Sequence, residues 1–278
     1  MLKPLQQDDV LLADIAAARN VPGKLHIWWL GQSGFLLQLN GTHLLLDPYL
    51  SDSLSIKYTQ TDKPHTRISE RVIDPALLPR IDVVTSSHNH TDHLDADTLR
   101  PILANSPRAT LIISEANRAF VADRLQIEVT YPTGLVAGDV VDINGMEFHP
   151  IPAAHNTLET DGQGRHKFMG YVVRWGGYVI YHSGDTLWYD GLPETLAPFR
   201  VDVAFLPING NVPERRVAGN LNPDEAAQLG KRIGAKLVIP HHYDLFTFNT
   251  ANPADFVTVC EREGTPHRVM QLGERVTI

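Results

Sequence analysis

Short apolar runs bounded by glycine, proline and polar residues recur along the 278-residue chain, and this pattern predicts β-strands. Pairs of such runs flank Asn40-Gly41, Asn144-Gly145 and Gly176-Gly177, and these dipeptides are typical of two-residue turns in β-hairpins. Other apolar runs, at residues 81–84, 110–113, 201–207, 236–240 and 269–278, have no hairpin partner next to them. They predict further strands joined through loops or helices.

Helical segments alternate with these strands. The clearest start is Asn222-Pro223 followed by Glu225, which is a capping-box pattern with proline at the first helical position. Helices are predicted at residues 10–18, 74–78, 95–104, 114–125, 222–234 and 252–263, and the polar stretch 51–71 is predicted to be a loop near the mouth of a site. The alternation of strands and helices predicts a layered α/β fold. We expect one domain, 1–278, with 1–24 as a leading helical segment.

Composition limits the classes of partner. Hydrophobic residues make up 43% of the chain, which is enough for a substantial core, and the formal net charge is −8. Lys and Arg do not cluster in a run, so we expect no nucleic-acid partner, and the N-terminus predicts neither a signal peptide nor a membrane anchor. Cys260 is the single cysteine and excludes an intrachain disulfide, so the cytoplasm is the expected location. We expect a small-molecule substrate, and a homo-oligomer is compatible with the sequence.

The strongest chemical signal is the stretch His88-Asn89-His90-Thr91-Asp92-His93, directly after the strand predicted at 81–84. His88 and His90 can converge on one cation through their imidazole nitrogens, while Asp92 and His93 can hold a second cation beside it. Two ions roughly 3.5 to 4 Å apart are typical of binuclear hydrolytic sites. A solvated histidine-rich loop is the alternative interpretation, and the preceding buried strand disfavours it.

Candidate ligands also follow the second strand of two hairpins. One strand leads to His155 and the other leads to Asp185. His155 would complete the first ion's ligands, and Asp185 would bridge both ions because a carboxylate has two oxygens and carries negative charge. We expect His182 to be a packed residue rather than a ligand.

An HxHxDH motif after a hydrophobic strand resembles the signature of the metallo-β-lactamase superfamily, and the resemblance extends from about Trp28 to the C-terminus. It implies a four-layer αββα sandwich with the metal site along one edge. It also implies that Asp47, after the first strand pair, accepts a hydrogen bond from a ligand imidazole and fixes its tautomer. The Pro-x-His-Tyr register of family members selects His242 rather than His241 as the last ligand, and strand alternation allows only one of the two to face the ions.

The expected ligands are all nitrogen or oxygen donors, which favours two divalent ions per chain, zinc or manganese before iron. The flavodiiron relatives place a glutamate where this chain has His90, which further disfavours redox iron chemistry. Two cations can lower the pKa of a bridging water to roughly 7 and polarise the oxygen that it attacks. We therefore predict hydrolysis by a metal-bridging hydroxide, with Asp92 as a catalytic residue that holds the second ion and orients the hydroxide.

Several stretches, among them residues 28–31, 181–185 and 235–240, are similar to the UlaG-like branch of the superfamily, which includes L-ascorbate-6-phosphate lactonase. The resemblance implies a small anionic ester or lactone as substrate, although this chain has His155 where the lactonase uses an acidic residue. The candidate substrate-binding residues are Asn209, Asn211, Arg215, Arg216 and Tyr243.

Two other functions remain open from the sequence. Similar ligand sets serve phosphodiesterases that act on nucleotides or phospholipids, although this chain has neither a basic stripe nor an amphipathic anchor. A non-catalytic, metal-stabilised binding module is the third hypothesis, and the complete ligand set disfavours it.

Overall fold

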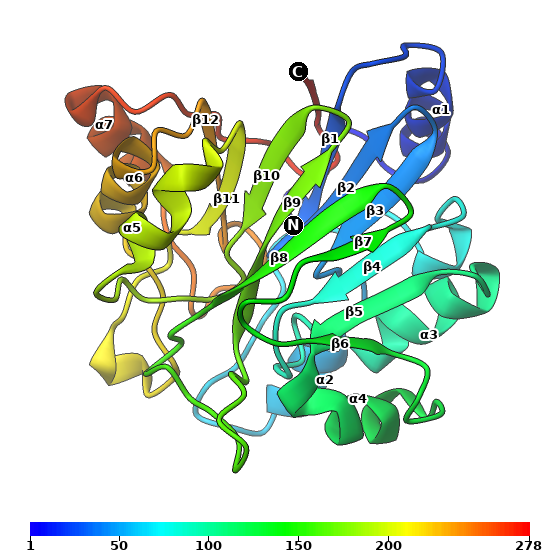
Figure 1. Ribbon diagram of the computed structural model, residues 1–278, viewed down its shortest axis with the longest axis horizontal. Coiled ribbons are helices and arrows are strands. Elements are labelled where there is room, and N and C mark those ends of the chain that lie inside the picture. The colour runs from blue at the N-terminus through cyan, green and yellow to red at the C-terminus, as the bar shows by residue number, and fades with distance from the viewer.

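The strands of the computed structural model, which describes residues 1–278, form two facing β-sheets (Figure 1). The first sheet has the order β13-β1-β2-β3-β4-β5-β6 and the second has the order β12-β11-β10-β9-β8-β7. The first sheet contains β1 (His26–Gly31), β2 (Gly34–Leu39), β3 (Thr42–Leu46), β4 (Val83–Ser86), β5 (Thr110–Ser114), β6 (Thr133–Leu135) and β13 (Arg275–Thr277). The second contains β7 (Val141–Ile143), β8 (Met146–Pro152), β9 (Met169–Trp175), β10 (Tyr178–His182), β11 (Val203–Pro207) and β12 (Leu237–His241).

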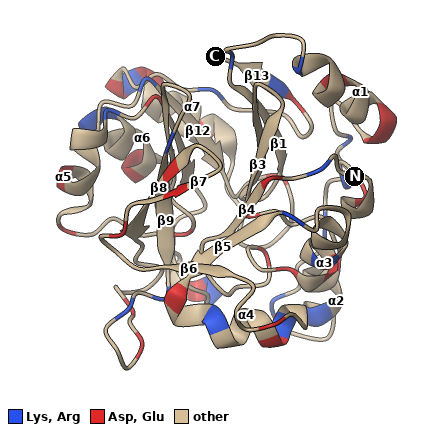
Figure 2. Cartoon of the chain, turned by 45° about the vertical axis from the view of Figure 1, so that its right-hand side comes forward, with Lys and Arg blue, Asp and Glu red and all other residues tan.

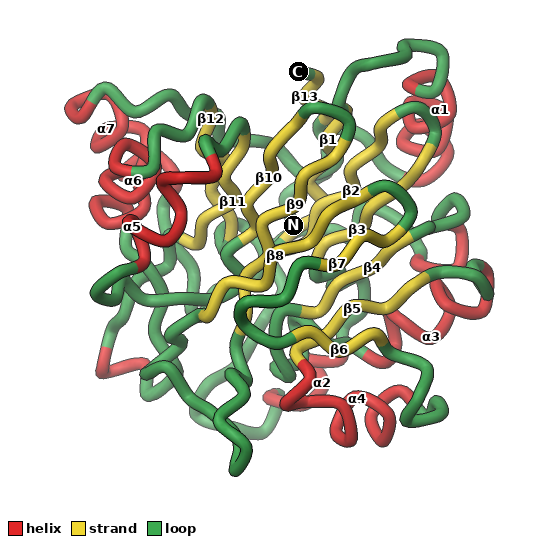
Figure 3. The backbone as a smooth tube through the Cα atoms, in the orientation of Figure 1, coloured by secondary structure: helices red, strands yellow, loops and turns green.

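Helices cover the outer faces of both sheets, as Figure 3 shows by secondary structure. The helices are α1 (Asp8–Ala18), α2 (Ser53–Tyr58), α3 (Ala96–Asn105), α4 (Arg118–Leu125), α5 (Leu192–Leu196), α6 (Pro223–Arg232) and α7 (Pro253–Glu263). Helices α5, α6 and α7 lie beside the second sheet, and α1, α3 and α4 lie beside the first (Figure 1). This arrangement confirms the predicted αββα sandwich.

One apolar cluster fills the space between the layers. It contains 63 buried residues, including Trp28, Phe35 and Phe205, and the Phe35 and Phe205 rings from opposite sheets lie 4.2 Å apart. Strands β1 and β2 are buried along their whole length, because one face meets the other sheet and the opposite face meets helices. This explains why apolar residues stand on both faces of these strands instead of alternating with polar ones.

Local signals in the sequence account for most element boundaries. The predicted capping box is present, with the Asn222 side chain accepting from the backbone of Glu225 and the Glu225 side chain accepting from the backbone of Asn222. The stretch 51–71 differs from its prediction, because it contains helix α2. The helix predicted at 114–125 begins instead with a 3-10 turn, Glu115–Asn117, before α4. The short β6 and α5 were not predicted, since three to five residues carry too little periodicity.

The direction of the strands creates one functional edge. Strands β3 and β4 run parallel to each other, and so do β10, β11 and β12. Strand β8 has the same direction as β10, because both are antiparallel to β9. The loops after β3, β4, β8, β10 and β12 all carry predicted site residues. None of the helices has the length and apolar character needed to span a membrane.

Candidate metal centre

Three overlapping groups of three potential ligands come together at this edge, and one of them, His88, His93 and Asp185, connects the other two. The first triad is His88, His90 and His155, and the second triad is Asp92, His93 and His242. Within each triad the potential ligand atoms lie within 4.8 Å of one another. The structure therefore brings together residues from three separate loops, in the same two groups that the sequence predicted.

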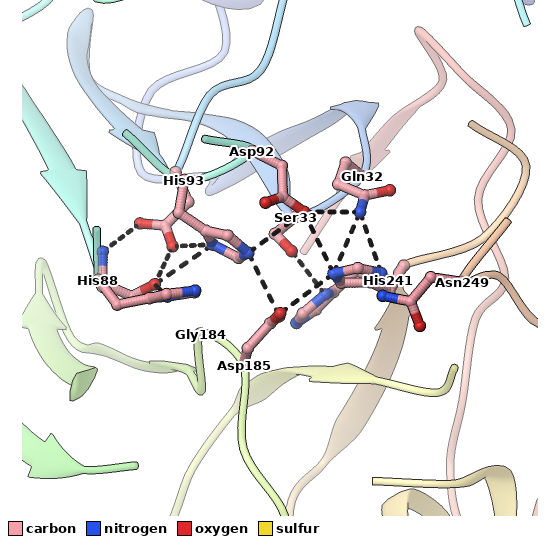
Figure 4. A network of polar contacts seen from close by, with 12 residues as sticks. Gln32, Ser33, His88, Asp92, His93, Gly184, Asp185, His241 and Asn249 are labelled. Atoms are coloured by element: carbon pink, nitrogen blue, oxygen red, sulfur yellow. Dashed lines mark hydrogen bonds and ion pairs between the residues drawn. The ribbon is translucent and has the colours of Figure 1, made fainter. Parts of the chain in front are cut away.

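Asp185 lies between the two triads. Its Oδ1 is 3.3 Å from Nε2 of His93, and its Oδ2 is 3.2 Å from Nε2 of His242 and 3.5 Å from Nε2 of His155. One carboxylate thus faces both triads, as Figure 4 shows for Asp185 and His93. This is the arrangement required of a bridging ligand.

The backbone around the site adopts conformations that L-residues rarely take. Gly184 has φ +57°, and a Cβ there would lie 2.6 Å from Cβ of Ser87, so only glycine lets the loop after β10 approach the metal-binding loop after β4. His242, the first residue beyond β12, has φ +70°, and Asp47 has φ +38°. Non-glycine residues in this region cluster at functional sites, where the surrounding structure holds them.

Hydrogen bonds behind the ligands fix the orientation of the rings. Asp47 accepts from Nδ1 of His93 at 2.7 Å, which is the role that the resemblance implied for it. The Ser87 backbone N–H also donates to Asp47. Nδ1 of His155 donates to the carbonyl of Gly219 at 2.8 Å. The contacts at Nδ1 leave Nε2 of His93 and Nε2 of His155 to face the candidate site, and such partners are common around metal-ligating histidines.

The buried polar atoms fit a metal site. Nε2 of His88 is buried and has no hydrogen-bond partner in the protein, and the buried Nε2 of His93 and Oδ1 of Asp185 have no hydrogen-bond partner beyond their mutual contact at 3.3 Å. Buried polar atoms normally have such a partner, and unpaired ones call for an explanation such as an ion. The donor set of imidazole nitrogens and carboxylate oxygens, with no thiolate, suits zinc or manganese.

The protonation of the first triad also suits metal binding. Burial lowers the pKa of His88 well below its usual 6.5, and the neighbouring His93 and His90 lower it further. Burial and the nearby His155 lower the pKa of His90 to about 4. The first triad therefore contains imidazoles that are neutral at pH 7, which is the form that binds metal.

In the second triad, His93 forms an ion pair with Asp185. Burial alone would lower the pKa of His93, but the carboxylates of Asp185 and Asp92 outweigh it and raise this pKa well above 6.5. Burial would raise the pKa of Asp185, but His242 and His93 hold it well below its usual range. The carboxylate is therefore ionised, and we expect ion binding to displace the proton from His93.

A pocket of about 420 Å³ opens above these residues. Its walls include members of both triads and Asp185, together with four cationic side chains: Lys57, Lys63, Arg124 and Arg216. Figure 2 shows basic positions on α2 and α4 at the same end of the molecule. Two larger surface hollows, of about 650 and 560 Å³, contain no member of either triad. The smaller pocket is therefore the candidate active site, because the potential metal ligands line it.

Most of the predicted substrate-binding residues lie outside this pocket, and only Arg216 lines it. The hydroxyl of Tyr243 donates to the Met270 carbonyl at 2.6 Å, and its buried ring stacks on Trp29 with centroids 4.3 Å apart. Tyr243 is thus a packing residue, since this stacking turns its side chain into the core.

Asn209, Asn211 and Arg215 line a different hollow. Asn209 is buried and donates to Oδ1 of Asn249 at 2.9 Å, and Arg215 donates to the carbonyl of Asn209 at 2.6 Å. Asn249 itself lines the active-site pocket. Asn209 and Arg215 therefore support a pocket residue from behind instead of facing the substrate.

His241 and His182 form a buried stack beside the ligands, with ring centroids 5.4 Å apart. Nδ1 of His241 lies 3.0 Å from the Ser33 hydroxyl, and Nε2 of His182 donates to the Ser33 carbonyl at 2.9 Å. Neither belongs to the two triads. Strand alternation, which was expected to let only one of His241 and His242 face the ions, does not apply to this pair, because β12 ends at His241 and His242 lies beyond it with a left-handed backbone.

Sequence reasoning did not find several pocket residues. Lys57, Lys63 and His65 come from the stretch 51–71, which was placed near the site without naming any residue in it, and Arg124 comes from α4. Gln32 contacts the second triad from the turn between β1 and β2. Its position between two glycines, Gly31 and Gly34, was the available signal.

Comparison with known proteins agrees with this geometry. The sequence model of a family described as "Beta-lactamase superfamily domain" matches residues 26–242. A UPF0173 metal-dependent hydrolase of Methanoculleus marisnigri is 27% identical over 91% of this chain and 97% of its own. A probable L-ascorbate-6-phosphate lactonase UlaG of Escherichia coli is 23% identical over 89% of this chain and 77% of its own. The structure of Igni18, a metallo hydrolase from Ignicoccus hospitalis, has a TM-score of 0.67 at 22% identity and covers 92% of this chain and 98% of its own.

Proposed function

Because the chain belongs to the β-lactamase superfamily and is a metal-dependent hydrolase, we propose that it uses two divalent metal ions to hydrolyse a small anionic ester or lactone. The observation that carries this proposal is the position of Asp185 between two ligand triads at the base of a pocket with four cationic side chains. The triads account for the number of ions, and the cations account for the charge of the substrate.

The first triad would hold one ion and the second triad the other, with Asp185 shared. Zinc or manganese fits these nitrogen and oxygen donors. When bound, two such ions lower the pKa of a water molecule between them and polarise the oxygen of the bond under attack.

We propose that Asp92, besides holding the second ion, orients the attacking water. Its Oδ2 lies 3.5 Å from Nε2 of His242 and 3.7 Å from Nε2 of His93, and its side chain is 15% exposed toward the pocket. Asp185 is more deeply buried, with 4% of its side chain exposed. Asp92 is therefore the carboxylate that can accept a hydrogen bond from the attacking water and orient it toward the substrate.

The cationic side chains support an anionic substrate. Lys57, Lys63 and Arg124 are in no ion pair, whereas Arg216 pairs with the exposed Asp62. The carboxylates in the pocket wall are Asp92 and Asp185, and both would be neutralised by ions. A site with loaded metals would therefore be strongly positive, although the whole chain carries a net charge of −8.

The relatives support the class of reaction. One of them is named as a probable lactonase of a phosphorylated sugar acid, which is an anionic substrate of this kind. At 23% identity the likeness supports an anionic lactone as a class, and the pocket of this chain has its own set of residues.

The proposal is tested by measuring hydrolysis of matched lactones and esters that differ only in an anionic group. We expect activity that a chelator removes, and KM for the anionic compound at least tenfold lower than for its neutral partner. Bis-p-nitrophenyl phosphate serves as the phosphodiester probe. Faster turnover of this compound than of every lactone and ester would favour a phosphodiesterase, and no turnover of any compound would favour a binding module.

A variant pair separates pocket charge from overall charge in the same assay. Lys57→Ala removes a cation from the pocket wall, and we expect KM for the anionic substrate to rise about tenfold, equivalent to about 1.4 kcal/mol, with the neutral partner unaffected. Lys231→Ala is the matched control, because Lys231 lies on α6 and pairs with Glu263 outside the pocket. Equal effects of the two substitutions would contradict an anion site in the pocket.

A further inference from the structure

Gln32 occupies a constrained position in the turn between β1 and β2. Its φ is +50°, and the residue is only 3% exposed. Its carbonyl accepts from the backbone N–H of His242 at 3.3 Å and from Nε1 of Trp29 at 3.1 Å. A non-glycine residue keeps a left-handed backbone only where the surrounding structure holds it, and such positions are concentrated at functional sites.

The side-chain amide of Gln32 contacts two members of the second triad. Its Nε2 donates to Oδ2 of Asp92 at 2.9 Å, and Figure 4 shows both residues. The same Nε2 lies 3.0 and 3.1 Å from the two ring nitrogens of His242. The ionised carboxylate of Asp92 can only accept hydrogen bonds, so the NH₂ end of the amide must face it. Gln32 makes no hydrogen bond with the first triad.

Gln32 holds the Asp92 side chain, as other partners hold other ligands. His93 is held by Asp47, and His155 is held by the carbonyl of Gly219. The side chain of Asp92 has Gln32 as its one hydrogen-bond partner in the protein. Asp92 also lies on a loop and is the more exposed carboxylate of the site, so we expect loss of Gln32 to let its side chain rotate toward the pocket.

We propose that Gln32 is a positioning residue for the second metal subsite, where its amide holds Oδ2 of Asp92 toward His242 before an ion binds. This inference rests on the proposed function only in requiring that the second triad binds an ion. It predicts an asymmetric effect, because loss of Gln32 disturbs one triad and leaves the other intact.

The test is a titration of metal-free protein with Zn²⁺ at buffered free concentrations, with Gln32→Met and Gln32→Gly. The methionine keeps the length of the side chain without a donor, and the glycine removes the side chain while relieving the positive φ, so the two variants change the turn in different ways. We expect both to bind the first ion with wild-type affinity and the second about 10 to 100-fold more weakly. Excess Zn²⁺ should restore most of the hydrolytic rate.

Gln38→Met is the matched control. Gln38 is a buried amide in β2 that donates to the carbonyl of Ile15 and contacts His43, away from both triads. This variant should lose stability yet bind both ions with wild-type affinity. The inference is overturned if the Gln32 variants bind the second ion as tightly as the wild type, or if they weaken both ions equally. A wild-type chain that binds a single ion would instead overturn the two-ion proposal itself.

Discussion

Replacing Asp185 with asparagine is expected to lower the hydrolytic rate by more than 100-fold and to release at least one metal ion per chain. The carboxylate faces His93, His155 and His242 at 3.3, 3.5 and 3.2 Å. The amide keeps the shape of the side chain but removes the negative charge that offsets two dications. Loss of a residue that only supports a metal ligand typically lowers metal affinity or activity by about 10 to 100-fold. Loss of a ligand shared by two ions should lower them further.

Rate and metal content are measured on the same preparation of the Asp185→Asn protein. Asp202→Asn is the matched control, because Asp202 precedes β11 at the opposite end of the same sheet, where it accepts from the Val179 backbone and pairs with Lys236. The control should keep both ions. An Asp185→Asn protein that also keeps both ions and its rate would show that the bridge lies elsewhere.

His242→Ala is expected to remove the second ion and most of the rate, whereas His241→Ala should keep both ions. Nε2 of His242 faces Asp92 and Asp185 at 3.5 and 3.2 Å. The ring of His241 instead contacts Ser33 and stacks on His182 in the core. Metal content and rate are compared for the two variants, and we expect His241→Ala to cost at most about 10 to 100-fold in rate.

The two histidines are neighbours, so a purely structural effect would change both variants in a similar way. Metal titration curves of the two variants distinguish such a structural effect from the loss of one metal ligand. Loss of metal from the His241→Ala protein, with both ions retained in the His242→Ala protein, would contradict the ligand assignment.

The candidate ligands could be located from the sequence because they follow strands. His88, His155 and Asp185 each come shortly after an apolar run, and the ends of strands that run in one direction meet at one edge of the sandwich. Strand signals are local, so the positions of these ligands could be inferred without knowing how the sheets pack. The family register selected His242, whereas strand alternation does not apply to the pair, because His242 lies beyond the end of β12.

The substrate pocket was harder to predict because its residues come from segments without periodicity. Lys57 lies on the short helix α2, and Lys63 lies in the loop after it. Asn209 and Arg215 lie in or near the loop after a strand that was expected to end at the site, yet the side chains of both contact Asn249. Which side of a loop faces a cavity depends on tertiary contacts such as these, and residue order alone does not specify them.

The measurement that tests the central claim most directly is hydrolytic rate as a function of metal occupancy. Metal-free protein is loaded with zinc or manganese in steps, and bound metal and rate are determined on each sample. Two triads joined by Asp185 predict that the protein binds two ions per chain and that most of the rate appears only as the second ion binds. Full activity at one ion per chain, or a chain that binds no metal, would contradict the account.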